Sequence, residues 1–92
     1  MKDKIIVIPE NFAVEEAGDL REKLYSMILK GDSNFLLDFS KCTFIDSTGL
    51  GVLVSVYKKC AEKNGTVKLR SINQQVMRVF KLTRLDNVFE II

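Results

Sequence analysis

The chain has 92 residues, with 14 lysines and arginines, 12 aspartates and glutamates, and a hydrophobic content of 47%. This length predicts one domain over residues 1–92, with a single core that buries about two-thirds of the unfolded surface. A formal net charge of +2 argues against a nucleic-acid partner, and no apolar run approaches the roughly 20 residues of a membrane-spanning helix.

The first half of the chain predicts two strands separated by a helix. An apolar run predicts a strand over residues 4–8, and Pro9 suits its end. Residues 9–11 are expected to form a short loop. Apolar residues at helical spacing then predict a helix over about 14–30, with Gly31 as its terminator. A second apolar run predicts a strand over residues 35–39, followed by a link to residue 45.

The second half continues the alternation. Leu50, Leu53, Val54, Tyr57 and Ala61 recur at helical spacing and predict a helix over about 47–64. A strand over 66–70, a helix through about residue 83 that Asn73 can cap, and a last strand over 88–92 follow. The core-facing residues expected in that last helix are Val76, Val79, Phe80 and Leu82. This order predicts an α/β domain with a mainly parallel four-stranded sheet and about three helices.

The hexapeptide Asp-Ser-Thr-Gly-Leu-Gly at residues 46–51 stands where an extended segment gives way to a helix. Asp46 or Ser47 can cap that helix, and most such sequences are ordinary capping chemistry. A serine hydroxyl there is also available for modification. A phosphate would be tolerated, because the first turn of a helix presents unpaired N–H groups and a partial positive charge. Gly49 and Gly51 are expected to keep the surface open to a partner.

Residues 44–52, Phe-Ile-Asp-Ser-Thr-Gly-Leu-Gly-Val, closely resemble the signature of the STAS domains that act as anti-sigma factor antagonists. The order of elements resembles that family from about residue 5 to residue 92. The resemblance therefore implies a STAS-like fold. In that family the first serine of the motif is the phosphorylated residue, which is Ser47 here, with Thr48 as its neighbour. The resemblance implies a partner-binding surface made of Asn11, Asp46, Ser47, Thr48, Gly49 and Leu50.

The implied function is a phosphorylation switch. An unphosphorylated antagonist binds an anti-sigma factor and so releases a sigma factor for transcription. The anti-sigma factor is typically also an ATP-dependent serine kinase, and a separate serine phosphatase reverses its action. Nucleotide then binds the kinase, so no cofactor is expected on this chain. The alternative hypothesis is a STAS-like structural or regulatory subunit of a lipid or anion transport assembly, and the intact motif favours the antagonist.

Two segments depart from the family pattern. Family members commonly carry a Gly-Glu-Leu-Asp-like segment before the first long helix. This chain has Glu-Asn-Phe-Ala at residues 10–13, with Ala13 in the acidic position. The chain also ends at Ile92, without the C-terminal helix of many relatives. At least one of Val88, Phe89, Ile91 and Ile92 should therefore be partly uncovered, which predicts weak self-association or a partner that covers it.

The absence of histidine excludes histidine general bases, histidine metal sites and the usual nucleophilic triads. Asp38 and Asp46 could form a carboxylate pair, but nothing completes a catalytic set, so neither enzyme activity nor a metal site is expected. Cys42 and Cys60 lack Cys-x-x-Cys spacing, and residues 1–4 lead into a strand rather than a signal peptide. We expect reduced cysteines in a cytoplasmic protein. The basic clusters at 58, 59 and 63 and at 78, 81 and 84 are expected to be solvated helix faces, which predicts no nucleic-acid or membrane partner.

Overall fold

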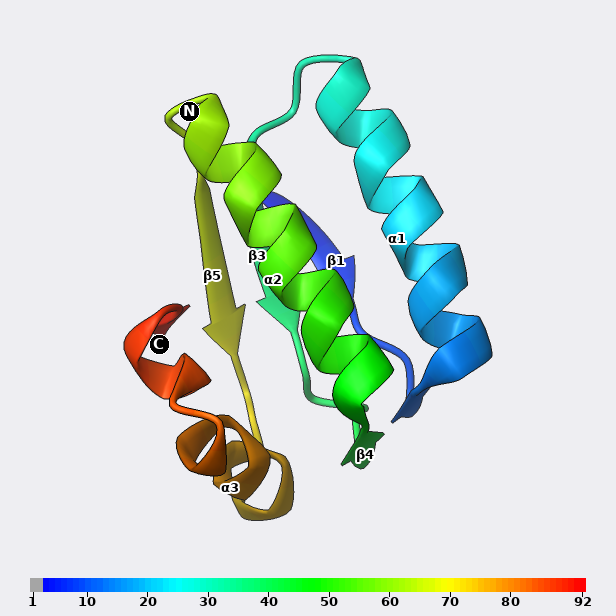
Figure 1. Ribbon diagram of the computed structural model, residues 1–92, viewed down its shortest axis with the longest axis vertical. Coiled ribbons are helices and arrows are strands. Elements are labelled where there is room, and N and C mark those ends of the chain that lie inside the picture. The colour runs from blue at the N-terminus through cyan, green and yellow to red at the C-terminus, as the bar shows by residue number, and fades with distance from the viewer. Residues whose placement is uncertain (1–2) are drawn as a thin grey trace.

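The computed structural model describes residues 3–92, which form one layer of helices packed on one parallel sheet (Figure 1). The strands of this sheet, in the spatial order β1-β3-β5-β6, are β1 (Lys4–Val7), β3 (Asn34–Asp38), β5 (Thr66–Arg70) and β6 (Glu90–Ile91). The helices are α1 (Val14–Leu29), α2 (Ser47–Glu62) and α3 (Gln74–Leu82), followed by the 3₁₀-helix η1 (Leu85–Asn87). The predicted α/β fold with four parallel strands and three helices is confirmed.

Two further strands were not predicted. β2 (Asn11–Phe12) and β4 (Phe44–Ile45) form a separate two-stranded parallel pair. The sequence favoured a loop at the first position and a link at the second. Two residues are too few to display the period-2 alternation by which a strand is recognised, so only the folded chain reveals this pair.

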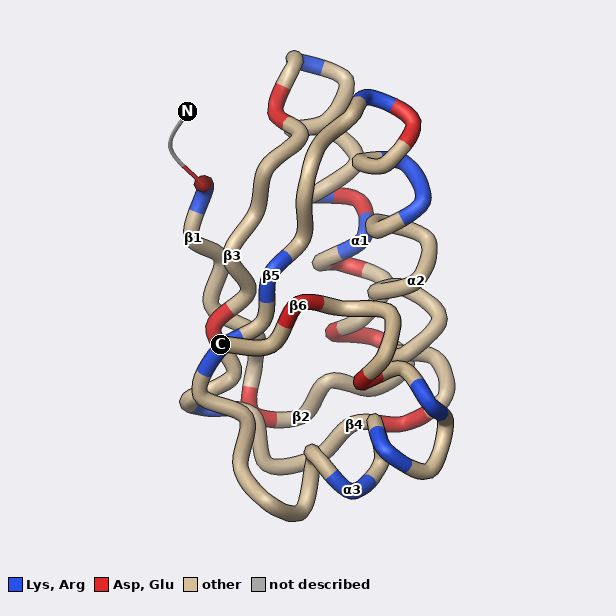
Figure 2. Tube along the Cα trace, turned by 90° about the vertical axis from the view of Figure 1, so that its left-hand side faces the viewer, with Lys and Arg blue, Asp and Glu red and all other residues tan. Residues whose placement is uncertain are grey.

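Both long helices lie on the same face of the sheet. α1 connects β1 to β3 and α2 connects β3 to β5, so two crossovers of the same hand step across the sheet in the same direction. The helices therefore lie side by side over one face, and the opposite face carries no helix within residues 3–92 (Figures 1 and 2). Phe35, Leu37, Val67 and Leu69 are buried and belong to the core between the sheet and the helices.

The buried face of α1 contains Ala17, Leu20, Leu24 and Ile28, as their spacing predicts. In α2 the buried residues are Gly49, Leu50, Val52, Leu53, Val56 and Cys60. The expected place of Ala61 on this face is wrong, because Ala61 is exposed. α2 packs against both the sheet and α1 through a face that includes Leu53, Val56 and Cys60. Ala61 follows Cys60 about 100° further around the helix, so it points away from this face.

The expected core position of Leu82 is also wrong. Val76 and Phe80 are the buried residues of α3, whereas the Leu82 side chain is 78% exposed. Two residues of an α-helix turn through about 200°, so Leu82 points away from the face that Phe80 buries. Phe80 in turn packs edge-on against Phe39, with ring centroids 5.9 Å apart, and against Phe89 at 6.3 Å.

The expected cap of α3 is confirmed, since Asn73 Oδ1 accepts a hydrogen bond from Val76 N at 2.8 Å. Cys42 and Cys60 are both free and buried, and burial raises the pKa of each thiol. Cys60 is a small residue of the core between α2 and its neighbours. Across residues 3–92, no helix has the length and apolar character needed to cross a bilayer. Met1 and Lys2, part of the N-terminal segment judged not to be a signal peptide, lie outside the described residues.

The C-terminal edge of the sheet leaves apolar surface exposed, as predicted. β6 pairs with β5 on one side and is the outermost strand of the sheet, while Val88 is 40% and Ile92 63% exposed. We predict weak self-association through this edge and expect Ile92→Lys to reduce it, because a charge replaces the apolar contact. Sedimentation velocity over a wide concentration range measures the effect, with Leu29→Lys as the control at an exposed leucine far from β6. A chain that stays monomeric up to millimolar concentration would contradict the prediction.

Candidate phosphorylation and partner-binding site

The short β2–β4 pair places the beginnings of α1 and α2 next to each other. Asn11 is in register with Phe44 and Phe12 with Ile45. α1 begins two residues after Phe12 and α2 begins two residues after Ile45, so the helices start from adjacent points and run parallel (Figure 1). The positive ends of both helix dipoles therefore face the same surface of the molecule.

Asp46 holds the first turn of α2 in place. Its backbone is extended, with φ −113° and ψ −173°, and its Oδ1 accepts a hydrogen bond from Gly49 N at 3.0 Å. Its carbonyl oxygen accepts from Leu50 N at 3.0 Å, and its N–H points to Phe12 O at 3.5 Å. Asp46 is therefore the N-cap of α2, and it also links this helix to β2.

Ser47 and Thr48 follow this cap and are both exposed. Their backbone N–H groups belong to the first turn, where an α-helix offers no carbonyl partner within itself. The Ser47 hydroxyl is thus accessible to a modifying enzyme, and oxygens of a group attached to it could accept hydrogen bonds from neighbouring N–H groups. Asp46 directly precedes Ser47, and the first turn of α1, which begins at the same end of the molecule, contains Glu15 and Glu16.

The expectation that Gly49 keeps the surface open is wrong. Gly49 is buried, and a Cβ atom built on it would lie 2.4 Å from Phe12 O and 2.9 Å from Ile45 Cγ1. A side chain is excluded there because the first turn of α2 presses directly against β2. Gly51, in contrast, is exposed with nothing within 4 Å of its Cβ position. Leu50 is only 9% exposed, so its side chain offers a partner little surface.

The remaining expected site residue, Asn11, is exposed on β2 opposite Phe44. The structure therefore brings the exposed Asn11, Ser47 and Thr48 to one end of the molecule, around the half-buried Asp46. The residue that sequence reasoning left out of the site is Phe44, whose side chain is 51% exposed. The sequence does show an aromatic residue at the start of the motif. Periodicity alone, however, cannot tell whether such a residue is exposed or belongs to the core.

Several groups tie β4 to α3. Cys42 Sγ donates to Phe44 O at 3.4 Å, and Asn73 Nδ2 donates to Cys42 O at 2.9 Å. Between β4 and α3 lies a groove of about 150 Å³. The residues that line it are Thr43, Phe44, Ile45, Gln75, Val76 and Val79. The site at the start of α2 is thus continuous along the chain with a hollow beside α3.

The two carboxylates considered as a pair have separate partners. Asp38 Oδ1 accepts from Ser40 N at 2.8 Å, and Asp38 Oδ2 pairs with Arg70 at 3.1 Å. The Ser40 backbone hydrogen bond, with help from Arg70, lowers the pKa of Asp38 below its usual value. Asp46 is occupied by Gly49 N. Within residues 3–92, no three His, Cys, Asp or Glu side chains are grouped so that they could hold a metal ion.

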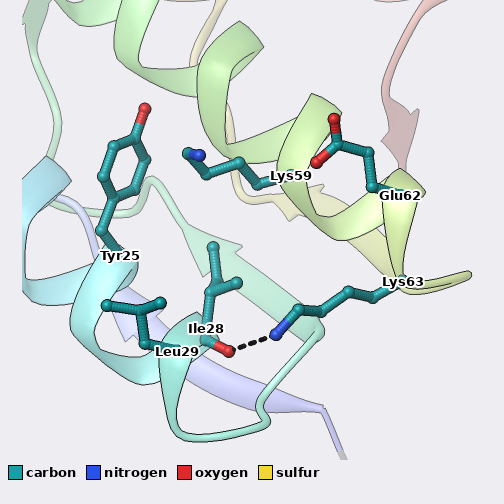
Figure 3. A pocket seen from close by; sticks show the side chains of 6 residues that line it. All are labelled: Tyr25, Ile28, Leu29, Lys59, Glu62 and Lys63. Atoms are coloured by element: carbon teal, nitrogen blue, oxygen red, sulfur yellow. Dashed lines mark hydrogen bonds between the residues drawn. The ribbon is translucent and has the colours of Figure 1, made fainter.

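A further hollow of about 200 Å³ lies at the far ends of α1 and α2 (Figure 3). Lys63 Nζ donates to Ile28 O at 2.6 Å, which satisfies a carbonyl in the last turn of α1. Lys59 Nζ lies 4.9 Å from the centroid of the Tyr25 ring, and the Tyr25 hydroxyl hydrogen-bonds to Ser55. These contacts join the two helices. The hollow therefore belongs to the packing between α1 and α2 and is separate from the site around Ser47.

Comparison with known proteins identifies close relatives. A family model described as STAS domain matches residues 2–92. The anti-sigma-B factor antagonist of Bacillus subtilis (strain 168) is 32% identical over 78 residues, which cover 85% of this chain and 71% of that protein.

Solved structures share the fold. A crystal structure from Thermotoga maritima, provisionally named an anti-sigma factor antagonist, superimposes with a TM-score of 0.88 at 30% identity, covering 99% of this chain and 80% of the other. A sulfate transporter family protein from Wolinella succinogenes gives a TM-score of 0.76 at 15% identity, covering 92% of this chain and 69% of the other. At that identity only the fold is shared.

The two glycines of the motif should respond oppositely to alanine. Gly49→Ala should lower the free energy of unfolding by about 1–3 kcal/mol, because the new Cβ collides with Phe12 O and displaces α2. Gly51→Ala should raise it by about 0.5–1 kcal/mol, because alanine is the better helix former and meets no neighbour. Urea unfolding measures both changes. Equal responses at the two positions would show that α2 does not press against β2.

Ala13 offers a second stability test. It is the N-cap of α1, with φ −130° and ψ −167°, and its side chain makes no capping hydrogen bond. Ala13→Ser should stabilise the fold by about 0.5–2 kcal/mol, because a hydroxyl oxygen can accept from an unpaired N–H of the first turn. Thermal unfolding measures the gain, with Ala13→Val as the control that changes size without adding an acceptor. A serine variant no more stable than the valine variant would contradict the prediction.

Proposed function

The chain belongs to the STAS domain family, and we propose that it is an anti-sigma factor antagonist switched by phosphorylation of Ser47. In this proposal the unphosphorylated chain binds an anti-sigma factor and so releases a sigma factor for transcription. The observation that carries it is the exposed serine in the first turn of α2, directly after the capping Asp46. The 32% identity to an anti-sigma-B factor antagonist supports the same role.

The first turn of α2 can accept a phosphoryl group without unfolding. Phosphorylation adds about −1.5 to −2 charges at neutral pH. At the N-terminus of a helix this charge meets unpaired N–H groups and the positive end of the dipole. Because α1 begins beside α2, its dipole favours the same charge. The modified chain therefore keeps its fold, and the switch acts on the interface.

The partner surface consists in this proposal of the exposed Asn11, Ser47 and Thr48 and the half-buried Asp46. Gly49 and Leu50 lie beneath this surface and support it, because they hold the first turn of α2 against β2. A phosphoryl group in the middle of this surface adds bulk and a charge of the same sign as Asp46. A partner that packs against the neutral hydroxyl of unmodified Ser47 would have to pack against a dianion after phosphorylation. The dianion would have to lose part of its hydration, which weakens binding.

The enzymes of the switch are separate proteins. We assign phosphorylation to the anti-sigma factor acting as an ATP-dependent serine kinase, and reversal to a serine phosphatase. Both would meet the chain in the cytoplasm. The chain itself contributes an accessible hydroxyl and a binding surface, and nucleotide belongs to the kinase. No catalytic step is assigned to its own side chains.

The fold alone does not decide between this role and a structural part in a transport assembly. A sulfate transporter family protein has the same fold at 15% identity. A structural subunit has no need of an exposed serine at the start of α2, whereas an antagonist depends on it. The intact motif, together with the names of the relatives at 30% identity and above, therefore favours the antagonist.

We predict that Ser47, and not Thr48, accepts the phosphoryl group. Each anti-sigma factor kinase encoded in the source genome is incubated with ATP and the chain, and intact mass spectrometry detects the addition of one phosphoryl group. Thr48→Ala should be modified like the natural chain, whereas Ser47→Ala should stay unmodified and bind the kinase constitutively. Ser47→Asp should bind more weakly because of its charge. Phosphate located on Thr48, with Ser47 unmodified, would contradict the assignment.

A further inference from the structure

Exposed apolar side chains lie at the groove between β4 and α3 and just beyond it along α3. Phe44, on β4, is 51% exposed, and Leu82, at the end of α3, is 78% exposed. Val79 lines the groove and is half-buried. Val79 also packs against the core, to which α3 contributes the buried Val76 and Phe80, whereas Phe44 and Leu82 are exposed and take no part in it.

Helix geometry places two apolar residues of α3, Val79 and Leu82, in one strip that is separate from the buried face of the helix. Gln75, Val79 and Leu82 are spaced i, i+4 and i+7 and therefore share one face. Gln75 and Val79 line the groove against Phe44, so Leu82 continues the strip beyond it, about 10 Å along the helix from Gln75. The result is an apolar track that starts at Phe44 and runs along the outer side of α3.

The flank of this track is basic. Residues 74–82 include Arg78 and Lys81 and no acidic residue, and Arg84 follows two residues later. Arg78 is spaced i+3 from Gln75, at the edge of the strip, and it lines a neighbouring hollow of about 430 Å³ together with Lys81. Figure 2 shows that α3 and its basic residues lie at the same end of the molecule as β4. A segment that fits this surface must supply apolar side chains for the track and negative charge for its flank.

We infer that the groove between β4 and α3 docks an acidic segment of the anti-sigma factor that presents apolar anchors, an inference that rests on the proposed function. Apolar side chains of the segment pack against Phe44, Val79 and Leu82. Its carboxylates lie against Arg78 and Lys81. Charge complementarity favours an acidic occupant, because Arg78 and Lys81 attract carboxylates and repel a basic segment.

This docking surface also gives the switch a physical basis. Phe44 lies three residues before Ser47, and β4 leads directly into α2. A phosphoryl group on Ser47 places a dianion beside the path of an acidic segment. Like-charge repulsion then weakens binding without a change in the fold of either partner. The basic flank of α3 attracts the same segment when Ser47 is unmodified.

The test measures binding with matched variants. The probes are the anti-sigma factor kinases encoded in the source genome, each purified and titrated separately into the full chain by calorimetry without ATP. Phe44→Ala and Leu82→Ala should each raise the dissociation constant about tenfold, as expected for the loss of an apolar anchor. Arg78→Glu should raise it at least about tenfold and should reduce the dependence of binding on salt.

The controls are Leu29→Ala, at a leucine 85% exposed at the far end of α1, and Lys58→Glu, at an exposed lysine in α2. Both should bind like the natural chain. Urea midpoints confirm that each variant is folded, and Leu82→Ala keeps the test valid if Phe44→Ala is unstable.

The outcomes distinguish a failure of this inference from a failure of the proposed antagonist function. If the natural chain binds a kinase and the three variants bind equally well, the groove is not the docking surface, while the antagonist function stands. Weakening by the apolar variants without any effect of Arg78→Glu overturns the acidic occupant. If the natural chain binds none of the kinases, the antagonist function fails and the inference fails with it. Weakening by all three variants, with both controls unchanged, supports the inference.

Discussion

The site depends on the contact between the first turn of α2 and the short strand β2. The backbone of Gly49 lies so close to Phe12 O that a Cβ atom would be 2.4 Å from it. This contact fixes how closely the first turn of α2 approaches β2. The register of β2 with β4 fixes where α1 begins relative to α2. The cap by Asp46, the exposure of Ser47 and the outward position of Phe44 all follow from this arrangement.

The two ends of the α1–α2 pair differ in how their polar groups are used. At the far end, Lys63 donates to Ile28 O and Tyr25 hydrogen-bonds to Ser55, so the helices are joined by side-chain contacts. At the near end the polar groups of Ser47 and Thr48 remain exposed. A rigid frame below an exposed hydroxyl suits regulation by charge, because a modification then changes what can bind rather than how the chain folds.

The same fold serves proteins with different roles, and a solved structure from a sulfate transporter family shares it at 15% identity. The function of this chain must therefore be argued from its site. The proposals rest on two features of that site: a serine in the first turn of α2, and an apolar track with a basic flank on α3. Both lie at the end of the molecule where β4 meets α2 and α3, so the proposed modification and the proposed docking would act on neighbouring parts of the surface.

The sequence by itself determined the three helices, the four strands of the main sheet and the cap at Asn73, and it narrowed the cap of α2 to Asp46 or Ser47. Periodicity and capping depend on residues within a few positions of each other. It also identified Ser47 as the residue of interest, through a local motif. Only the tertiary structure decided that β2 pairs with β4, that Gly49 is buried and that Leu82 is exposed. Such features depend on neighbours far away in the chain: Gly49 meets Phe12, 37 positions before it, and no local pattern records which distant backbone will approach.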